Sequence, residues 1–408
     1  MIKNIDVIFW VEHKDRELES YKEVSKILKD KYNLNSIIMS NFFHSYYLWF
    51  YKARIYIFNN LNNNIGWPDG FLWETYGDSV KYISHRWEQN LFPVNYKFRA
   101  PKYDFEKRNV NLFCWDNKFK EYLVSHGVEE KNVKVVGNIA NNILWNMQDK
   151  KNQFRGMFAK EFSLDLDRQW LFMPMNYNWA FITQDAIDHK VRGGYDKEIA
   201  KEYNMYSKKS INKFILFIDE ISKKYNYEII IRPHPSITND EYINLFNKIL
   251  GCIPENIIIN KEYSVREWIT ASDIIGSSWS TSVFDAFNIG KKAFYFTPYE
   301  RANWLNTYWL DSVPNIKDIE GFNIFITNKN KLKIIHAEDA GSLEKFADKI
   351  YKLLPKNKPQ IKKLNIKYAK NLVKYLIKNM LCKYFKCRFI MKWQTYDWFN
   401  IIKVSKTK

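Results

Sequence analysis

Hydrophobic positions in the first 140 residues alternate between two periods. The run Ile5–Trp10 is β-branched and aromatic, as in a buried strand. After Asp15, which can cap a helix, apolar residues recur every three or four positions at Leu18, Tyr21 and Val24. Further strands are expected at Asn35–Met39, Arg54–Phe58, Asn111–Trp115 and Lys134–Gly137. Strands that alternate with helices in this way predict a parallel sheet with helices on both faces.

The same alternation restarts after a polar stretch of irregular pattern at about 141–168, which is the predicted linker. The next strand is expected at Trp170–Pro174, and a long amphipathic helix at Tyr203–Tyr225. Further strands are expected at Glu228–Arg232, Ile257–Ile259, Asp273–Gly276 and Ala293–Phe296. The pattern predicts two doubly wound Rossmann-like α/β domains, at residues 1–150 and 165–340, followed by a helical and then basic, aromatic tail at 341–408.

Composition fits this organisation. The 408 residues are 46% hydrophobic and 17% aromatic, which excludes a disordered or collagen-like chain and agrees with two domains. The four cysteines are too few and too scattered for a disulfide scaffold, so a reducing compartment is expected. The first residues do not read as a signal peptide, and no run of 18 uncharged apolar residues occurs. The chain is therefore expected to be cytoplasmic.

The net charge of +18 is concentrated at one end of the chain. Residues 351–408 contain 16 Lys and Arg and one acidic residue, a formal charge of +15, while the first 350 residues carry +3. A nucleic-acid groove along the whole molecule is therefore not expected.

Within residues 382–408, Lys and Arg alternate with Tyr, Phe and Trp, which is typical of a segment at a membrane surface. Two alternatives are stacking on nucleic acid and a basic helix that packs on the N-terminal domain. The favoured prediction is a peripheral protein held on the anionic inner membrane face by residues 382–408.

Polar residues that directly follow strands are the candidates for binding or catalysis, because doubly wound sheets bind ligands outside the carboxyl ends of their strands. The segment Arg232–Ser236 reads Arg-Pro-His-Pro-Ser, and its two prolines restrict the turn. Arg232 can bind a phosphate with two parallel hydrogen bonds, and His234 can donate to a phosphoryl oxygen or act as an acid or base. The alternative is a plain turn with an exposed histidine.

A second candidate is the serine-rich segment Ser277–Ser282, which follows a predicted strand and opens a helix. Backbone N–H groups and the hydroxyls of Ser280, Thr281 and Ser282 could bind an anion there, although a simple helix cap is the alternative. Asp285, one turn into the helix, could reach a ribose diol. Asn176, in the loop after the strand Trp170–Pro174, is a weaker candidate.

Together these segments resemble a known group of enzymes. Residues 271–296 resemble the donor-binding segment of GT-B glycosyltransferases. The Arg-Pro-His-Pro motif resembles bacterial surface-carbohydrate biosynthesis proteins and the CDP-glycerol glycerophosphotransferases of teichoic acid synthesis. Trp10–Leu18 and Val135–Asn138 also look like the surface-carbohydrate group. The resemblance is firmest over residues 228–300.

The resemblance implies a GT-B-like fold with two domains that face a cleft, and it implies roles for single residues. Ser280 and Thr281 fall where the family meets the donor pyrophosphate, and His234 where teichoic-acid polymerases place a histidine serving the donor phosphates. Asp285 falls where many GT-B enzymes carry a longer glutamate that binds the ribose. Such enzymes generally need no metal or other cofactor, since the nucleotide-sugar is itself a substrate, and no metal-ligand spacing contradicts this.

A general base is expected from the N-terminal domain. Candidates are Glu12, His13, Glu74 and His85, of which Glu12 and His13 have the better position because they directly follow the first strand. Their alternatives are a helix-capping acid and a surface histidine.

The resulting hypothesis is a metal-independent glycosyltransferase of surface polysaccharide (capsule, lipopolysaccharide or related) synthesis. It would move a sugar from a nucleotide-sugar to a glycan or lipid-linked acceptor. A CDP-glycerol-type polyol-phosphate transferase and a sugar-nucleotide epimerase are alternatives with the same fold. A nucleic-acid- or polymer-binding module on a GT-B scaffold is the non-enzymatic alternative.

Overall fold

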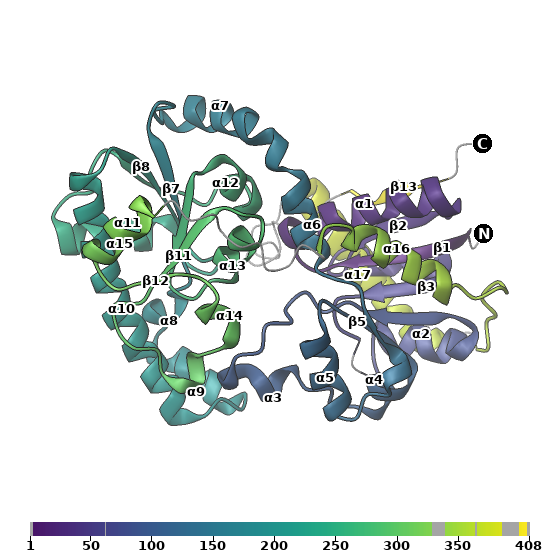
Figure 1. The fold of residues 1–408 in the computed structure, drawn as a ribbon. Helices are drawn as coiled ribbons and strands as arrows, with labels where there is room; N and C mark the ends of the chain where they lie inside the picture. Colours follow the sequence, from purple (N-terminus) through teal and green to yellow (C-terminus); the bar gives the residue numbers. More distant parts are fainter. Residues whose placement is uncertain (1–2, 62, 329–338, 364, 386–399, 406–408) are drawn as a thin grey trace. The chain divides into compact units, whose positions relative to one another are not determined.

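The computed structural model divides into two compact units that are interleaved in the sequence (Figure 1). Unit 1 comprises Met1–Gln89, Phe98–Ile143 and Glu338–Lys408, and unit 2 comprises Asn90–Lys97 and Leu144–Ala337. The structure describes residues 3–405 except 62, 329–338, 364 and 386–399.

Unit 1 contains a sheet with the strand order β13-β2-β1-β3-β4-β5-β6. All neighbouring strands are parallel except β13, which is antiparallel to β2 at one edge. The strands are β1 (Lys3–Val11), β2 (Ser36–Ser40), β3 (Tyr51–Phe58), β4 (Lys81–Ser84), β5 (Val110–Cys114), β6 (Val133–Val135) and β13 (Ile402–Val404). The helices include α1 (Lys14–Tyr32), α2 (Asp69–Tyr76), α4 (Asp104–Asn109), α5 (Asn117–Ser125), α6 (Ile139–Asn146), α16 (Ser342–Leu353) and α17 (Ala369–Phe385), while α3 (Tyr96–Arg99) spans a boundary between the units.

Unit 2 contains a parallel sheet with the strand order β12-β11-β10-β7-β8-β9. The strands are β7 (Gln169–Pro174), β8 (Tyr227–Arg232), β9 (Ile257–Ile259), β10 (Ile274–Ser277), β11 (Lys292–Phe296) and β12 (Asn315–Ile316). The helices are α7 (Lys151–Phe162), α8 (Asn178–Phe181), α9 (Gln184–Arg192), α10 (Lys197–Lys224), α11 (Asn239–Leu250), α12 (Val265–Ala271), α13 (Thr281–Asn288), α14 (Tyr308–Asp311) and α15 (Ile319–Thr327).

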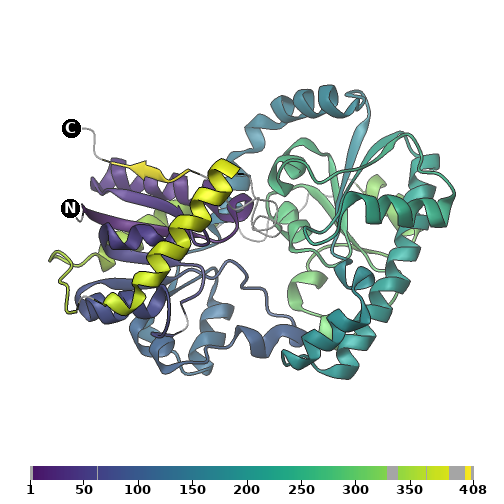
Figure 2. The ribbon, with the colours of Figure 1, turned by 180° about the vertical axis from the view of Figure 1, so that it is seen from behind.

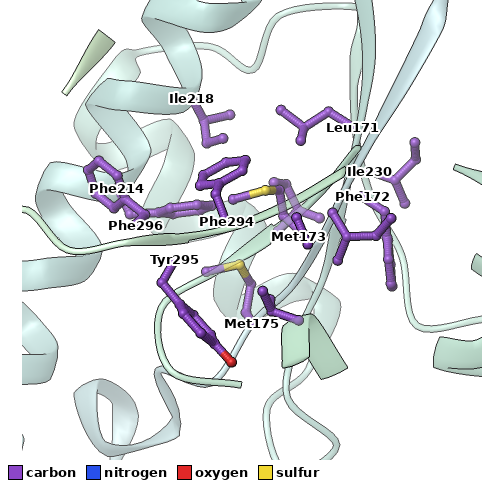
Figure 3. Packing of buried hydrophobic residues seen from close by; sticks show 14 of the residues in the cluster. Leu171, Phe172, Met173, Met175, Phe214, Ile218, Ile230, Phe294, Tyr295 and Phe296 are labelled. Carbon is purple, nitrogen blue, oxygen red and sulfur yellow. The ribbon is translucent and has the colours of Figure 1, made fainter. Parts of the chain in front are cut away.

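The core of unit 2 lies between its sheet and the helices packed on it. Figure 3 shows Phe294 and Phe296 of β11 beside Phe214 of α10 and Met173 of β7. Gly276 of β10 is required by this packing, because a Cβ atom there would lie 2.4 Å from the Phe294 ring and 2.7 Å from the Met173 sulfur. The predicted α/β class with parallel sheets is confirmed.

The boundary between the units, at 143/144, falls inside the stretch 141–168 that was predicted as a linker, but most of this stretch is helical, in α6 and α7. Phe154 and Phe158, one turn apart on α7, are buried, and the Phe158 ring lies 4.2 Å from that of Trp268. The sequence does contain a helical signal here, since Phe154, Phe158 and Phe162 recur every four positions, but polar and charged residues surround them and the prediction gave these more weight.

The segment 341–408 belongs to unit 1. Phe346 and Ile350 of α16 are fully buried, and Asp348 accepts a hydrogen bond from Lys31 of α1 at 3.0 Å. The stretch Ile402–Val404 is a strand rather than part of a helix. Residues 386–399 and 406–408, which hold much of the predicted basic and aromatic pattern, lie outside the described residues. Over the part of the chain that is described, none of the helices is long and apolar enough to cross a bilayer.

Candidate functional site

The candidate residues of unit 2 lie at the point where the strand order reverses. The chain runs from β7 through β8 to β9, then returns to the other side of β7 with β10. The loops after β10, β7 and β8 therefore leave adjacent strands at the same edge of the sheet. Their backbones are joined, since Met175 N–H donates to the Arg232 carbonyl at 2.8 Å and the Ser277 hydroxyl donates to the Pro174 carbonyl. In doubly wound sheets this position is the usual ligand site.

The turn after β8 holds the His234 ring in a defined orientation. The backbone N–H of Ser236 donates to His234 Nδ1 at 3.2 Å, and the Ser236 hydroxyl lies 2.8 Å from the same nitrogen. Because Nδ1 accepts a hydrogen bond, the proton of the neutral ring is assigned to Nε2. The ring, which is half-buried, can therefore act as a hydrogen-bond donor through Nε2.

Lys261 holds this turn, and Arg232 holds the loop that carries Lys261. Lys261 Nζ donates to the carbonyl oxygens of Pro235 and Ile237, each at 2.8 Å. Arg232 is buried, and its Nη2 donates to the carbonyl oxygens of Lys261 and Tyr263 at 3.2 and 3.0 Å. Burial and the Arg232 charge lower the pKa of Lys261. Arg232 thus stabilises the neighbouring loop, and its predicted contact with a donor phosphate stays a prediction.

The serine-rich segment forms the N-terminus of α13, as the sequence indicates. Ser280 is the N-cap residue, and its hydroxyl accepts a hydrogen bond from Ser282 N–H at 3.3 Å. The Tyr295 hydroxyl donates to the Ser280 carbonyl at 3.0 Å, which fixes the start of the helix from β11. Thr281, Ser282 and Asp285 are half-buried in the first turns of α13. The positive end of the helix dipole is therefore at the sheet edge that also carries His234.

Unit 1 has a candidate cavity at the corresponding point of its own sheet. The chain passes from β1 to β2 and then to β3 on the other side of β1. A cavity of about 350 Å³ lies where the loops after β1 and β3 meet, and among its lining residues Asn59 donates to the Glu12 carboxylate. Its lining residues are Glu12, His13, Arg16, Asn59, Asn60, Arg86, Trp87, Glu88, Phe98, Arg99, Ala100, Lys102, Tyr103 and Glu106.

Paired arginines and glutamates line this cavity. Glu88 accepts from Arg16 at 2.9 Å and from Arg99 at 2.6 Å, and although burial raises its pKa, the two arginines lower it overall. Arg86 donates to Glu106, which is almost fully buried, and burial raises the Glu106 pKa despite this partner. These ion pairs hold several charged groups in fixed positions along the cavity, which gives it a polar wall.

Glu12 and His13 are both in this cavity, whereas Glu74 and His85 are not. The loop that carries Glu12 is held by the fully buried Glu17, whose carboxylate accepts from Glu12 N–H at 2.8 Å. Glu74 accepts from Lys367 at 2.7 Å and from Tyr368 at 3.0 Å. His85 is fully buried in the core of unit 1.

Sequence reasoning missed Arg16, Asn59, Arg86, Arg99 and Lys102 as residues of the cavity. Asn59 and Arg86 had a usable signal, since each closely follows a strand that ends at this edge. Arg99 and Lys102 had none, because they come from a segment without strand periodicity that only the tertiary fold brings to the sheet.

The two units are Rossmann-like, and together they define the GT-B-like fold class. No protein-family model and no curated protein matches the chain.

Solved structures of this fold class do match. A variant of the wall teichoic acid polymerase TagF soaked with CDPG aligns over 86% of this chain and 89% of its own, with a TM-score of 0.54 and 13% identity. The UDP-GlcNAc 2-epimerase from Methanocaldococcus jannaschii aligns over 86% of this chain and 100% of its own, with a TM-score of 0.52 and 13% identity. At these identities the likeness shows the fold alone.

Proposed function

We propose that this protein is a glycosyltransferase of surface polysaccharide synthesis that takes a sugar from a nucleotide-sugar. The observation that carries the proposal is the edge of the unit 2 sheet at the carboxyl ends of β8 and β10, which we call the donor edge. There the loop of His234 and the N-terminus of α13 follow β8 and β10, the neighbours of β7 on either side. The Nε2–H group of His234 and the N-terminus of α13 favour binding of a diphosphate, which is the leaving group of nucleotide-sugars.

In this reaction the groups of unit 2 stabilise developing negative charge. His234 Nε2–H would donate to a phosphoryl oxygen, while Ser280, Thr281 and Ser282 would offer hydroxyls and backbone N–H groups to the diphosphate. Asp285 would accept hydrogen bonds from the ribose hydroxyls. No metal takes part in this proposal, since helix dipole and basic side chains supply the positive charge.

The acceptor is proposed to bind in the cavity of unit 1. Its polar wall suits a glycan or a lipid-linked glycan, and Glu12 or His13 would remove the proton from the attacking hydroxyl. Attachment to the inner membrane face through residues 382–408 would bring the enzyme to a lipid-linked acceptor.

Transfer of a polyol phosphate is the second candidate, because one structure with the same fold is a teichoic acid polymerase soaked with CDPG. Product analysis separates the two, since only this reaction leaves phosphodiesters in the product. An epimerase would convert the donor without any acceptor.

The proposal is tested by thermal shift with UDP-, CDP-, GDP- and CMP-linked donors. At least one donor should raise the melting temperature of the wild type, and His234→Ala should weaken its binding by on the order of tenfold, as expected for a charge-assisted hydrogen bond. Ser236→Ala, which keeps the ring and the backbone N–H contact, is the matched control and should lose much less. Absence of stabilisation by every donor would contradict the proposal.

A further inference from the structure

The C-terminal helix α17 has a continuous apolar stripe on its outer side. Val373, Leu376, Ile377, Met380 and Tyr384 recur at the three- and four-residue spacing of one helix face, and they are 40 to 66% exposed. In Figure 2, α17 is the long yellow helix at the front of unit 1. An amphipathic helix of a globular protein normally turns such a stripe toward the core.

The opposite side of α17 is the one that packs on unit 1. The Tyr375 ring is stacked on Trp67 with centroids 6.2 Å apart, and Asn379 Nδ2 donates to the Phe43 carbonyl at 3.4 Å. Cys382, on the same side, is buried, and Lys378 lies over the Phe42 and Phe43 rings. The helix is therefore fixed in rotation by its polar and aromatic side, so the apolar stripe faces outward.

Positive charge flanks the stripe. Lys370 and Lys374 lie along one border of it and Lys383 along the other, and all three are exposed. The stretch 351–385 contains ten lysines and no acidic residue. An apolar stripe with lysines on both borders is complementary to a surface that is negatively charged outside and apolar just beneath.

We propose that α17 lies flat in the interface of an anionic lipid bilayer. Its stripe would enter the region between headgroups and acyl chains, and its lysines would contact the lipid phosphates. A second copy of the chain fits less well, because pairing two stripes would bring the positively charged lysines that flank them together. This proposal rests on the membrane attachment in the proposed function and assigns the contact to the exposed face of α17 rather than to residues 386–399.

The test is co-sedimentation of the full-length protein with vesicles of phosphatidylcholine alone and with vesicles that also contain phosphatidylglycerol. Wild type should bind the anionic vesicles preferentially. Ile377→Ser and Met380→Ser should each weaken binding by on the order of tenfold through loss of apolar burial. Lys370→Gln and Lys374→Gln should each weaken it about fivefold on anionic vesicles only.

The matched control is Ile324→Ser on α15 of unit 2, where an isoleucine is 63% exposed outside the stripe and binding should not change. Donor-induced thermal shift is recorded for every variant and should equal that of wild type, which separates this proposal from the transferase proposal. Three outcomes would overturn it: unchanged vesicle binding in the stripe variants, equal loss in Ile324→Ser, or a wild-type dimer that Ile377→Ser converts to a monomer.

Discussion

At the scale of single residues, His85 illustrates how burial decides the role of a titratable group. It follows β4 at the carboxyl edge of the sheet, where a catalytic histidine could lie, yet its ring packs among aromatic side chains with no exposure. Burial, and secondarily the Arg16 charge, lowers its pKa to about 3. His85 is therefore a neutral core residue.

This burial predicts a dependence of stability on pH. Between pH 6.5 and pH 3 the unfolded chain binds a proton at His85 that the folded chain does not, so the free energy of unfolding falls with acidification, by about 1.4 kcal/mol per pH unit. His85→Phe should remove this contribution while keeping an aromatic ring. Urea denaturation at pH 7 and pH 5 measures it.

The slope of unfolding free energy against pH is compared between wild type and His85→Phe. Buried His44, whose pKa burial lowers to about 4, contributes equally to the slope in both proteins. Equal pH dependence in wild type and His85→Phe would show that the histidine is not buried as described.

At the scale of elements, α13 joins a stability role to a proposed binding role. Its Ser280 side chain satisfies one of the N–H groups that a helix start leaves without partners, and the Val283 N–H donates to the Ser280 carbonyl at 3.2 Å. Helix α5 offers a comparison, since Asp116 caps it by accepting from Phe119 N–H at 2.8 Å in unit 1.

Ser280→Ala should lower the free energy of unfolding by about 1 kcal/mol and also weaken donor binding several-fold. Asp116→Ala should cost similar stability but leave donor binding unchanged, because α5 is not at the donor edge. Chemical denaturation and donor titration are measured on both variants. Equal donor affinity in the two would refute the assignment of α13 to the diphosphate.

At the scale of the whole molecule, the C-terminal segment completes unit 1 rather than extending from unit 2. Phe346 of α16 packs with ring centroids 4.8 Å from His85 and 4.9 Å from Phe113, and β13 pairs with β2. Because β13 closes a sheet edge, deleting residues 382–408 would remove structure together with charge, so point substitutions on α17 test membrane binding more cleanly.

Phe346→Ala should lower the stability of unit 1 by about 3 to 5 kcal/mol. A nucleotide-linked donor that binds the wild type should instead raise the unfolding temperature of unit 2. Differential scanning calorimetry with and without that donor distinguishes the two effects. If the donor raises the unfolding temperature of the same unit that Phe346→Ala destabilises, the donor site has been assigned to the wrong unit.

Much of the fold was accessible from the sequence because buried parallel strands are short apolar runs with clear ends. The predicted strands at Glu228–Arg232 and Ile257–Ile259 agree with β8 and β9, and the serine-rich segment does cap a helix. Helix α7 was missed although Phe154, Phe158 and Phe162 recur every four positions, because polar and charged residues surround them. Arg99 and Lys102 were missed because their segment has no periodicity of its own.

The sequence by itself determined the α/β class, the position of polar loops after strands and the concentration of positive charge in the last 58 residues. Those features depend on local spacing and composition. Only the tertiary structure decided that His85 is buried, that Arg232 holds a loop, and that the apolar stripe of α17 faces outward. Each of these depends on which other segment packs against the residue, and contacts between distant segments leave no trace in the local pattern.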